Sequence, residues 1–368
     1  MVIVVAAVFG GVGYAIGHGY PSSTPAAVTN STLSILAAGT LAATFSNLAN
    51  TLVNETPGIS DPSAAQTYEG SLDVTTAITS LHAAADVVAL ADFRLAPQLL
   101  EPTYANYEVV FGMTPEVLAY DPGMMVSSGP AFAGINSTNW PSLLYQCATS
   151  CQASSGGAFT GVPLGVWNAS SDPNGYNEIF SLELQGLYFN STHSTNATLG
   201  QFYSGGPGGF DIPNPTLTRV EHESAAATLV STGTVCAVIT YRSFAVANHM
   251  SFVSFNSTVG LNDTSPAALS TYSTLTTKIT SSSGALVPVQ AAPVLFAVTV
   301  PLNAQNPSLG NEFVHLLLSP QGSAVISAGG AFTPIFPGWV DHPSAVPGIL
   351  APDVTSMPSW ASALLPSG

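Results

Sequence analysis

The sequence predicts an α/β fold of two lobes, each a mostly parallel sheet flanked by helices. Short apolar runs alternate with segments in which apolar residues recur at helical spacing, as in chains whose strands and helices alternate. The chain has 368 residues, of which 46% are hydrophobic, and this is enough for two lobes with separate cores. Crossings near Tyr120 and at residues 286–293 divide the chain so that a cleft and a hinge lie between the lobes.

The first lobe is expected to comprise residues 32–119 and 290–355. The apolar run at 33–37 ends at Gly39-Thr40, and Leu41, Phe45, Leu48 and Leu52 then share one face of a helix. A second strand at 65–68 ends at Gly70-Ser71 and leads into another helix. The remaining elements are strands at 86–91, 108–111, 116–120 and 293–300 and a helix at 309–318.

The second lobe is expected to comprise residues 120–289, with 356–368 as a C-terminal tail. Residues 123–161 and 192–215 are rich in glycine and polar residues and are predicted to be mainly loop. A strand at 164–167 leads through the turn beginning at Asp172 into a helix. A helix at 225–230 and a strand at 235–240 follow.

The charge balance restricts the classes of partner. Only 7% of residues are charged, with 20 Asp and Glu against four Lys and Arg, for a net charge of −16. Nucleic-acid binding requires clustered basic side chains, so it is not expected. An anion site in this chain would depend on backbone N–H groups, hydroxyls and helix dipoles. The low charge reflects either compositional drift or an acidic medium, in which excess Lys and Arg would leave an unbalanced positive charge.

The N-terminus indicates export. Residues 1–20 form an uncharged apolar segment that suits a signal or membrane anchor, with a buried core helix as the alternative, and 21–31 form a polar linker. We therefore expect an extracellular or cell-surface protein. Eight Asn-x-Ser/Thr sequons allow glycosylation there: Asn30, Asn54, Asn136, Asn168, Asn190, Asn196, Asn256 and Asn262.

Three cysteines are present. Cys147 and Cys151 lie four residues apart in a Ser- and Gly-rich stretch and could form a small surface disulfide in an oxidising compartment. Cys236 lies in an apolar run and is expected to be a buried thiol.

Two strand-to-helix turns are candidates for an anion site. Thr40 and Ser71 each follow a glycine at the point where a strand gives way to a helix. Hydroxyl and amide donors meet there with the positive end of the helix dipole. Either residue alone could be an ordinary N-cap, but a pair in neighbouring turns favours a shared anion site.

Five segments, taken in order, resemble the archaeal tungstate/molybdate-binding proteins of ABC importers. The resemblance covers about residues 32–350 and rests on AAGTLAATFSNLANTL, ADVVALADFRLAPQLLEPTYANYEVVFGMTPEVLAY, WNASSDPNGY, LVSTGTVCAVITYRS and FAVTVPLNAQNPSLGNEFVHLLLSPQGSAVI. It implies a periplasmic-binding-protein type II fold and a monomer that delivers tungstate or molybdate to a membrane permease. It also implies no cofactor and no catalytic residue.

The resemblance also implies a set of site residues. The oxyanion would be held by Gly39-Thr40 and Gly70-Ser71, with Asp172 and Glu223 approaching the metal and Tyr241 closing the site. Thr40 replaces the usual serine and keeps the hydroxyl, whereas Ser170-Ser171 replaces a more acidic stretch.

Each lobe-2 assignment has an alternative from the residues themselves. Asp172 could form a simple Asx turn or helix cap, Glu223 could complement a helix dipole, and Tyr241 could be a core aromatic. Glu221 could take the place of Glu223, and His222 is expected at the surface or behind the ligands.

Carboxylates facing a dianion are reasonable if they bind its metal centre, because hard cations favour carboxylate oxygen. Tungsten and molybdenum accept that expansion of their coordination, whereas the sulfur of sulfate does not. The chain has no G-x-S-x-G, HExxH, P-loop or Rossmann signature, so an enzyme is not expected. The alternatives are a binding protein for another oxyanion, such as sulfate or phosphate, and a non-binding cell-surface glycoprotein.

Overall fold

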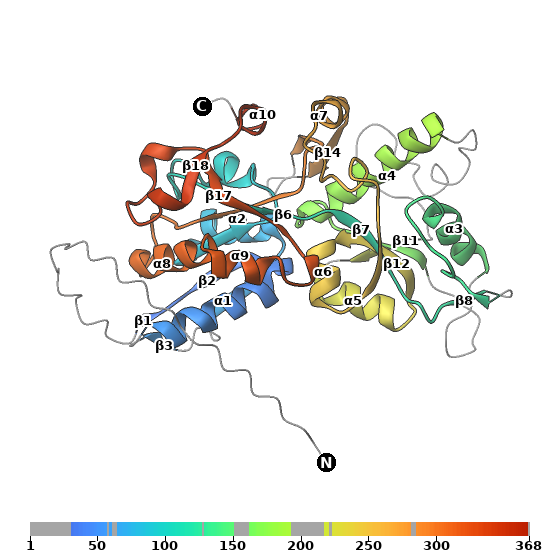
Figure 1. Cartoon of the computed structure of the whole chain (residues 1–368), viewed down its shortest axis with the longest axis horizontal. Helices are drawn as coiled ribbons and strands as arrows, with labels where there is room; N and C mark the ends of the chain where they lie inside the picture. Colours follow the sequence, from blue (N-terminus) through green and yellow to red (C-terminus); the bar gives the residue numbers. More distant parts are fainter. Residues whose placement is uncertain are drawn as a thin grey trace, which may run out of the picture.

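A computed structural model describes residues 31–56, 59–60, 65–126, 129–150, 162–192, 217–220, 223–280 and 285–366. These residues form two α/β lobes side by side, which confirms the predicted fold class (Figure 1). The first lobe contains both ends of the described chain, and the second lobe contains its middle part. The predicted signal or anchor segment and Glu221, His222, Cys151, Asn30 and Asn196 lie outside the described residues.

The first lobe is built on a seven-stranded sheet in the order β18-β17-β6-β16-β5-β2-β4. Its strands are β2 (Ile35–Ala38), β4 (Gln66–Glu69), β5 (Val87–Leu90), β6 (Val109–Met113), β16 (Leu295–Thr299), β17 (Thr333–Val340) and β18 (Val354–Ser356). The helical segments include η1 (Gly39–Leu41), α1 (Ala42–Glu55), α2 (Ser71–Thr79), η3 (Ala96–Leu100), α8 (Pro307–Leu317), α9 (Pro320–Ile326), η4 (Ala328–Gly330), η5 (Pro343–Ala345), η6 (Ala351–Asp353) and α10 (Ser359–Ser362). Helices on both faces leave the central strands buried on both sides, which explains their continuous apolar runs.

The core of the first lobe confirms the helical spacing read from the sequence. Phe45, Leu48 and Leu52 of α1 are buried together. The Phe45 ring lies 5.1 Å from that of Phe313 on α8, in an edge-to-face arrangement that aromatic pairs favour. This packing holds α1 firmly behind the turn that precedes it.

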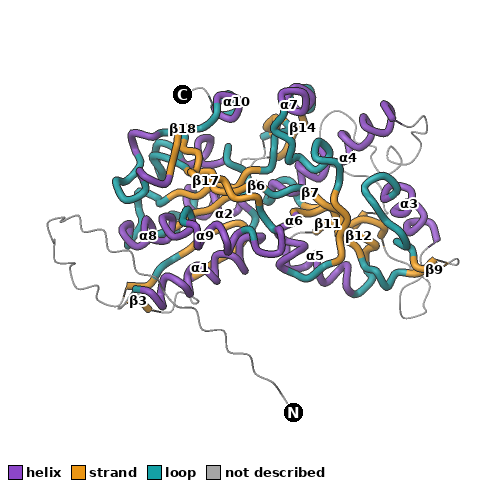
Figure 2. The backbone as a smooth tube through the Cα atoms, viewed as in Figure 1, coloured by secondary structure: helices purple, strands orange, loops and turns teal. Residues whose placement is uncertain are grey.

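The second lobe is built on a five-stranded sheet in the order β11-β10-β12-β7-β13. Its strands are β7 (Glu116–Tyr120), β10 (Val162–Trp167), β11 (Leu217–Val220), β12 (Val235–Tyr241) and β13 (Ser251–Ser254). Its helices are α3 (Trp140–Ser150), α4 (Pro173–Thr192), α5 (Glu223–Ser231) and α6 (Arg242–Ala247). Figure 2 shows the helices of both lobes arranged around their sheets.

The prediction of mostly parallel sheets was wrong. In the first lobe β2 runs parallel to β4 and β5, but β16 runs antiparallel to both β5 and β6. In the second lobe β7 runs antiparallel to both β12 and β13. A strand that arrives from the other lobe enters its sheet without a local βαβ crossover, so it is not required to run parallel to its neighbours.

Three boundaries differ from the expected ones. Residues 116–119, expected in the first lobe, belong to β7 of the second-lobe sheet, so the first crossing lies at Thr114-Pro115. The expected loop at 123–161 contains α3. The expected tail at 356–368 includes α10, whose Ala361 packs with Met357 and Phe93 in the first lobe.

Between the lobes lie α7 (Pro266–Tyr272) and the hairpin of β14 (Thr276–Thr280) and β15 (Leu286–Gln290), before the chain returns to β16. Two-stranded pairings also join β1 (Ser31–Thr32) to β3 (Ile59–Ser60) and β8 (Met125–Val126) to β9 (Gly129–Pro130). Thr114 is fully buried at the crossing. Its hydroxyl donates to the Ala331 carbonyl at 2.8 Å and accepts from the Ser243 amide at 3.2 Å. One side chain therefore links the hinge to both lobes.

The predicted cysteine pairing was wrong. Cys147 on α3 is bonded to Cys236 on β12, with both residues fully buried and their Cα atoms 6.5 Å apart. Because 89 positions separate the two residues, their proximity arises only from the packing of α3 on the sheet. An inward disulfide fits the oxidising compartment expected of an exported protein.

Asn54, Asn136 and Asn256 are exposed, so these three sequons are accessible. Among the described residues, no helix has the length and apolar character needed to cross a membrane.

Candidate functional site

The two predicted turns of the first lobe lie at neighbouring strand ends, because β2 and β4 pair in parallel. Thr40 is in η1, and Ser71 is the first residue of α2; both are buried. Neither caps its helix, since the caps are Ala38 and Gly70 and neither end has a side-chain capping bond. The ordinary N-cap interpretation is therefore wrong for both residues.

Both hydroxyls are held by partners outside their own helices. The Ser71 Oγ accepts a hydrogen bond from the Ala91 amide at 2.9 Å. The Thr40 Oγ1 lies 3.0 Å from the Ser243 Oγ of the second lobe, a bond in which either oxygen can donate. The Ser71 hydroxyl accepts its bond and so keeps a proton to donate to an anion, and Thr40 keeps one when Ser243 is the donor of their bond.

In the second lobe, Asp172 lies directly before α4, and its side chain is buried. Its Oδ1 accepts from the Asn174 amide at 2.8 Å, so one oxygen forms the Asx turn that the sequence allowed. The other carboxylate oxygen, Oδ2, is the one available to coordinate a metal centre. Burial is the main cause that raises the pKa of Asp172 to about 6, and the charge of Asp73 adds to it.

Tyr241 ends β12 and is fully buried. Its ring packs edge-on against Phe296 at 5.4 Å, as a core aromatic would, and its hydroxyl accepts from the Asn177 side-chain amide at 3.1 Å. Burial raises the pKa of Tyr241 well above its usual value, and the nearest charge that adds to this is that of Asp172. Tyr241 and Asp172 therefore lie in one neighbourhood, with the phenol kept as a neutral donor.

Glu223 is the first residue of α5, as predicted. The helix lies against η1, which contains Thr40. The position of its side chain is outside the described part, so its role as a ligand stays a prediction.

Direct contacts bring the predicted residues of the two lobes together. The Leu72 amide in the first turn of α2 donates to the carbonyl of Ser171 at 3.0 Å, beside Asp172. The bond between Thr40 and Ser243 also joins the two lobes, two residues after Tyr241. The turn at Gly70-Ser71 thus lies against the segment that contains Asp172, and the turn at Gly39-Thr40 lies against α6, which directly follows Tyr241. The structure represents a closed arrangement of the cleft.

Gly70 is required at this interface for space. Its φ of −62° suits any residue, but a Cβ atom there would collide with the Ser171 carbonyl oxygen. Backbone atoms cannot yield to such a contact without moving the whole lobe. We expect Gly70→Ala to leave each lobe folded and to prevent full closure, so that affinity for the ligand falls by about 10- to 100-fold. Calorimetric titration measures this.

Gly186→Ala is the matched control for Gly70→Ala, because a Cβ atom at Gly186 on α4 meets nothing within 4 Å. Equal affinities in both variants and the wild type would show that closure at Ser171 is not needed for binding.

Sequence reasoning missed two buried glutamates beside Asp172. Glu116 starts β7, opposite Tyr241, and Glu178 is on α4; both are fully buried. Neither oxygen of Glu116 has a hydrogen-bond partner among the described residues, whereas one oxygen of Glu178 accepts from the Trp167 amide at 3.1 Å. Burial raises the pKa of both groups well above the usual value, and the charges of Glu178 and Asp172 add to the rise at Glu116. Burial therefore favours the neutral form of both carboxyls.

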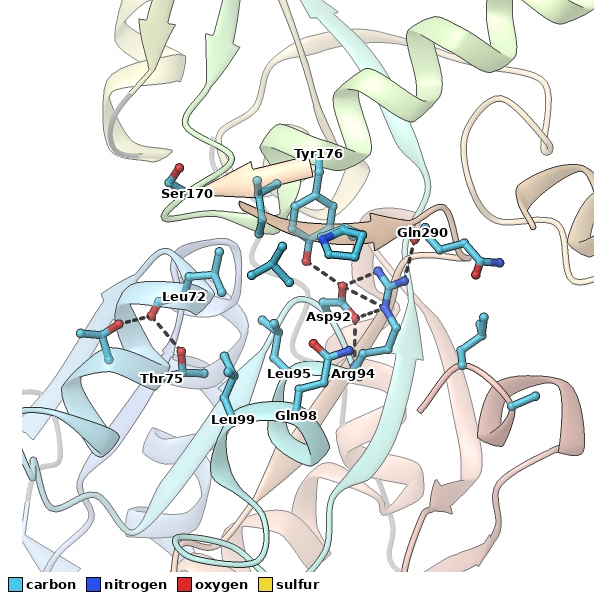
Figure 3. Close-up of a pocket in the computed structure, with 17 residues that line it drawn as sticks. Leu72, Thr75, Asp92, Arg94, Leu95, Gln98, Leu99, Ser170, Tyr176 and Gln290 are labelled. Carbon is cyan, nitrogen blue, oxygen red and sulfur yellow. Dashed lines mark hydrogen bonds and ion pairs between the residues drawn. The ribbon is translucent and has the colours of Figure 1, made fainter. Parts of the chain in front are cut away.

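A charged group also joins the lobes on the hinge side. Arg94 and Asp92 form a buried ion pair at 2.6 Å, and Tyr176 of α4 donates to the same Asp92 oxygen at 2.7 Å. Arg94 also donates to the Gln290 carbonyl at 2.6 Å. Although burial alone would raise the pKa of Asp92, the neighbouring guanidinium keeps it below its usual value. Figure 3 shows Tyr176 reaching from the second lobe to this pair.

The described cavity next to this ion pair is not the predicted anion site. It has a volume of about 300 Å³ and reaches from α2 and η3 to the β14–β15 hairpin and to Ala363 and Leu364, which follow α10. It shares Leu72, Asp92 and Tyr176 with the lobe interface, but Thr40, Ser71, Asp172 and Tyr241 do not line it. The segments that contain these residues instead contact one another at the lobe interface.

Comparison with known proteins assigns this arrangement to a family. A family model described as bacterial extracellular solute-binding protein matches residues 33–331. An uncharacterised solute-binding protein of Methanoculleus marisnigri is 28% identical over 75% of this chain and 76% of its own length. The molybdate/tungstate-binding protein of Thermococcus kodakarensis is 25% identical over 70% of this chain and 68% of its own.

Solved structures share the fold. The periplasmic molybdate-binding protein of Azotobacter vinelandii matches with a TM-score of 0.50 and 13% identity, over 82% of this chain and 98% of its own. The sulfate-binding protein SubI of Mycobacterium tuberculosis matches with a TM-score of 0.51 and 12% identity, over 83% and 87%. The family match spans most of both lobes and agrees with their topology. The chain therefore belongs to the family of bacterial extracellular solute-binding proteins.

Proposed function

We propose that this protein captures tungstate or molybdate outside the cytoplasm and delivers it to the membrane permease of an ABC importer. One observation carries the proposal: across the lobe interface the turn at Thr40 bonds to Ser243, two residues after Tyr241, and the turn at Ser71 bonds through the Leu72 amide to Ser171, next to Asp172. The similarity to molybdate/tungstate-binding relatives supports this choice of ligand.

The donors at this interface suit a small oxyanion. Hydroxyls and first-turn amides bind the oxygens of a dianion without a full positive charge, and the helix dipole of α2 favours the negative charge. A chain with a net charge of −16 and four basic side chains must use such neutral donors. Organic solutes instead call for aromatic walls and many polar side chains.

Asp172 supplies the discrimination between oxyanions. An ionised carboxylate repels a sulfate dianion, but it can add an oxygen ligand to tungsten or molybdenum. The pKa of about 6 means that Asp172 is ionised at pH 7 and protonated in more acidic solution. Acidification through pH 6 should therefore weaken tungstate binding and relieve the repulsion of sulfate.

Calorimetric titration of tungstate and sulfate at one pH and salt concentration tests the proposal. We expect Asp172→Asn to weaken tungstate binding by about 10- to 100-fold, equivalent to roughly 1.4–2.8 kcal/mol, and to leave sulfate binding unchanged or stronger. Asp121→Asn is the matched control, because Asp121 forms the same kind of turn with the Gly123 amide at 2.7 Å but lies away from the cleft.

Two results would contradict the proposal at different levels. Equal losses of affinity for tungstate and sulfate in Asp172→Asn would contradict ligation of the metal by Asp172. The protein would then remain an oxyanion-binding protein. A wild-type protein that binds none of tungstate, molybdate, sulfate and phosphate would overturn oxyanion capture altogether.

A further inference from the structure

A group of acidic side chains with one histidine lies in the first lobe, apart from the cleft. Glu101 follows η3, and Asp341 and His342 follow β17. One ligand atom from each lies within 4.8 Å of the others. The His342 Nε2 is 3.2 Å from a Glu101 oxygen, and the amides of His342 and Glu108 both donate to Asp341 Oδ1, at 2.7 and 2.9 Å. Backbone bonds thus fix the direction of the Asp341 carboxylate.

Glu108 supplies an independent sign of a ligand. Its side chain is fully buried, and neither carboxylate oxygen has a hydrogen-bond partner among the described residues. Buried Oε1 of Glu101 and buried Oδ2 of Asp341 likewise have none. A buried carboxylate oxygen without a partner costs several kcal/mol, so four such atoms in one place call for a bound group.

The Glu108 carboxyl lies within electrostatic reach of the other two. Alternation along β6 places Val109 and Phe111 in the large core and Val110 in the smaller cluster on the opposite face of the sheet. Glu108 precedes Val109 and so shares the face of Val110. The charges that act most strongly on Glu108 are those of Asp341 and then Glu101.

We propose that Glu101, Glu108, Asp341 and His342 form a binding site for a divalent cation of the Mn²⁺ or Zn²⁺ class. Three carboxylates and one imidazole provide the mixed oxygen and nitrogen ligands that these ions accept, whereas calcium and magnesium favour oxygen alone. Adjacent carboxylates repel one another, and a dication removes that repulsion. The competing explanation is a proton shared between Glu101 and Asp341.

A cation at this site would link segments of the first lobe that are distant in the sequence. Glu101 and Glu108 flank the segment between η3 and β6, whereas Asp341 and His342 begin the C-terminal part that contains β18 and α10. A cation bound to all four would stabilise this end of the first lobe without touching the oxyanion.

The test uses the full chain, stripped of metal, with Mn²⁺ and Zn²⁺ added separately at pH 7. Calorimetry is expected to show one saturable site, and thermal unfolding is expected to shift to higher temperature as the site fills. Glu108→Gln should weaken binding by at least about 10-fold, equivalent to roughly 1.4 kcal/mol. Its metal-free form should unfold no earlier than the wild type, because the substitution removes a buried acid that repels Asp341 and Glu101 when it ionises.

His342→Ala is a second variant, and it should not disturb folding because His342 is exposed. This substitution should weaken the binding of Zn²⁺ more than the binding of Mn²⁺. Asp353→Asn is the matched control. Asp353 forms another His–carboxylate pair in the same lobe, 2.6 Å from His315. Its substitution should leave the binding of both cations unchanged. The proposed cation site would be wrong if the wild type showed no saturable binding, or if Glu108→Gln bound the cations as tightly as the wild type. Either result would favour the proton shared between Glu101 and Asp341.

Discussion

The free energy of unfolding is expected to fall as the pH rises above about 4.5. Glu116 and Glu178 are fully buried, and their pKa values in the folded protein lie well above the usual 4.5. In the unfolded chain both lose their protons near pH 4.5, so the folded state binds more protons above that pH. Each carboxyl then removes about 1.4 kcal/mol of stability per pH unit until its folded-state pKa is reached.

Asp172 contributes in the same direction over a narrower window, between 3.8 and about 6. Asp92 has the opposite sign, because its pKa is lowered, and its effect is confined to pH values below its usual 3.8. Denaturant titrations at three pH values between about 4.5 and 7.5 measure the slope. A maximum of stability in acid would support the acidic-medium interpretation of the composition.

Glu178→Gln should flatten the pH dependence by about 1.4 kcal/mol per pH unit, since the amide keeps an oxygen to accept from the Trp167 amide. Glu69→Gln, at an exposed position on β4, should leave the slope unchanged. A wild-type stability that rises over this pH range would mean that these carboxyls are ionised in the fold.

Removal of the Cys147–Cys236 disulfide is expected to lower the free energy of unfolding by about 2–5 kcal/mol. The bond closes a loop across 89 positions, which restricts the unfolded chain, and it joins α3 to the strand that ends at Tyr241. In the double variant Cys147→Ala/Cys236→Ala, thermal unfolding should shift down by on the order of 10 °C.

Cys151→Ala distinguishes the observed pairing from the one expected from spacing. This variant should unfold like the wild type, and a reducing agent should lower the unfolding temperature of both to that of the double variant. A loss of stability in Cys151→Ala, with none in Cys236→Ala, would restore a bond between Cys147 and Cys151.

Local patterns were enough to predict most of the strands and helices. Continuous apolar runs identified β5 and β12, and helical spacing of Phe45, Leu48 and Leu52 identified α1. The glycine and serine around α3 predict a loop there, although Trp140, Leu144 and Cys147 are buried at helical spacing. Strand direction in β7 and β16 depends on the path between lobes, which local patterns do not contain.

The candidate site was predictable only where a residue lies in a recognisable turn. Thr40 and Ser71 follow a glycine at a strand end, and Asp172 precedes a Pro-Asn-Gly turn. Asn177 and Glu116 reach Tyr241 only through packing within the second lobe, and Ser243 meets Thr40 only where the two lobes touch. For Glu116, an acidic residue opening the apolar run 117–119 was the signal that sequence reasoning passed over.

The contacts that close the cleft separate the strength of binding from its selectivity. The bonds from Leu72 to Ser171, between Thr40 and Ser243, and from Tyr176 to Asp92 join the lobes directly. They stabilise the closed conformation by the same amount for every ligand, so they shift the open–closed equilibrium uniformly. A substitution that removes the Tyr176 hydroxyl would rescale all dissociation constants together. Ranking among anions is left to the few atoms that the anion itself touches, so evolution can retune the preferred ligand without altering how tightly the lobes close.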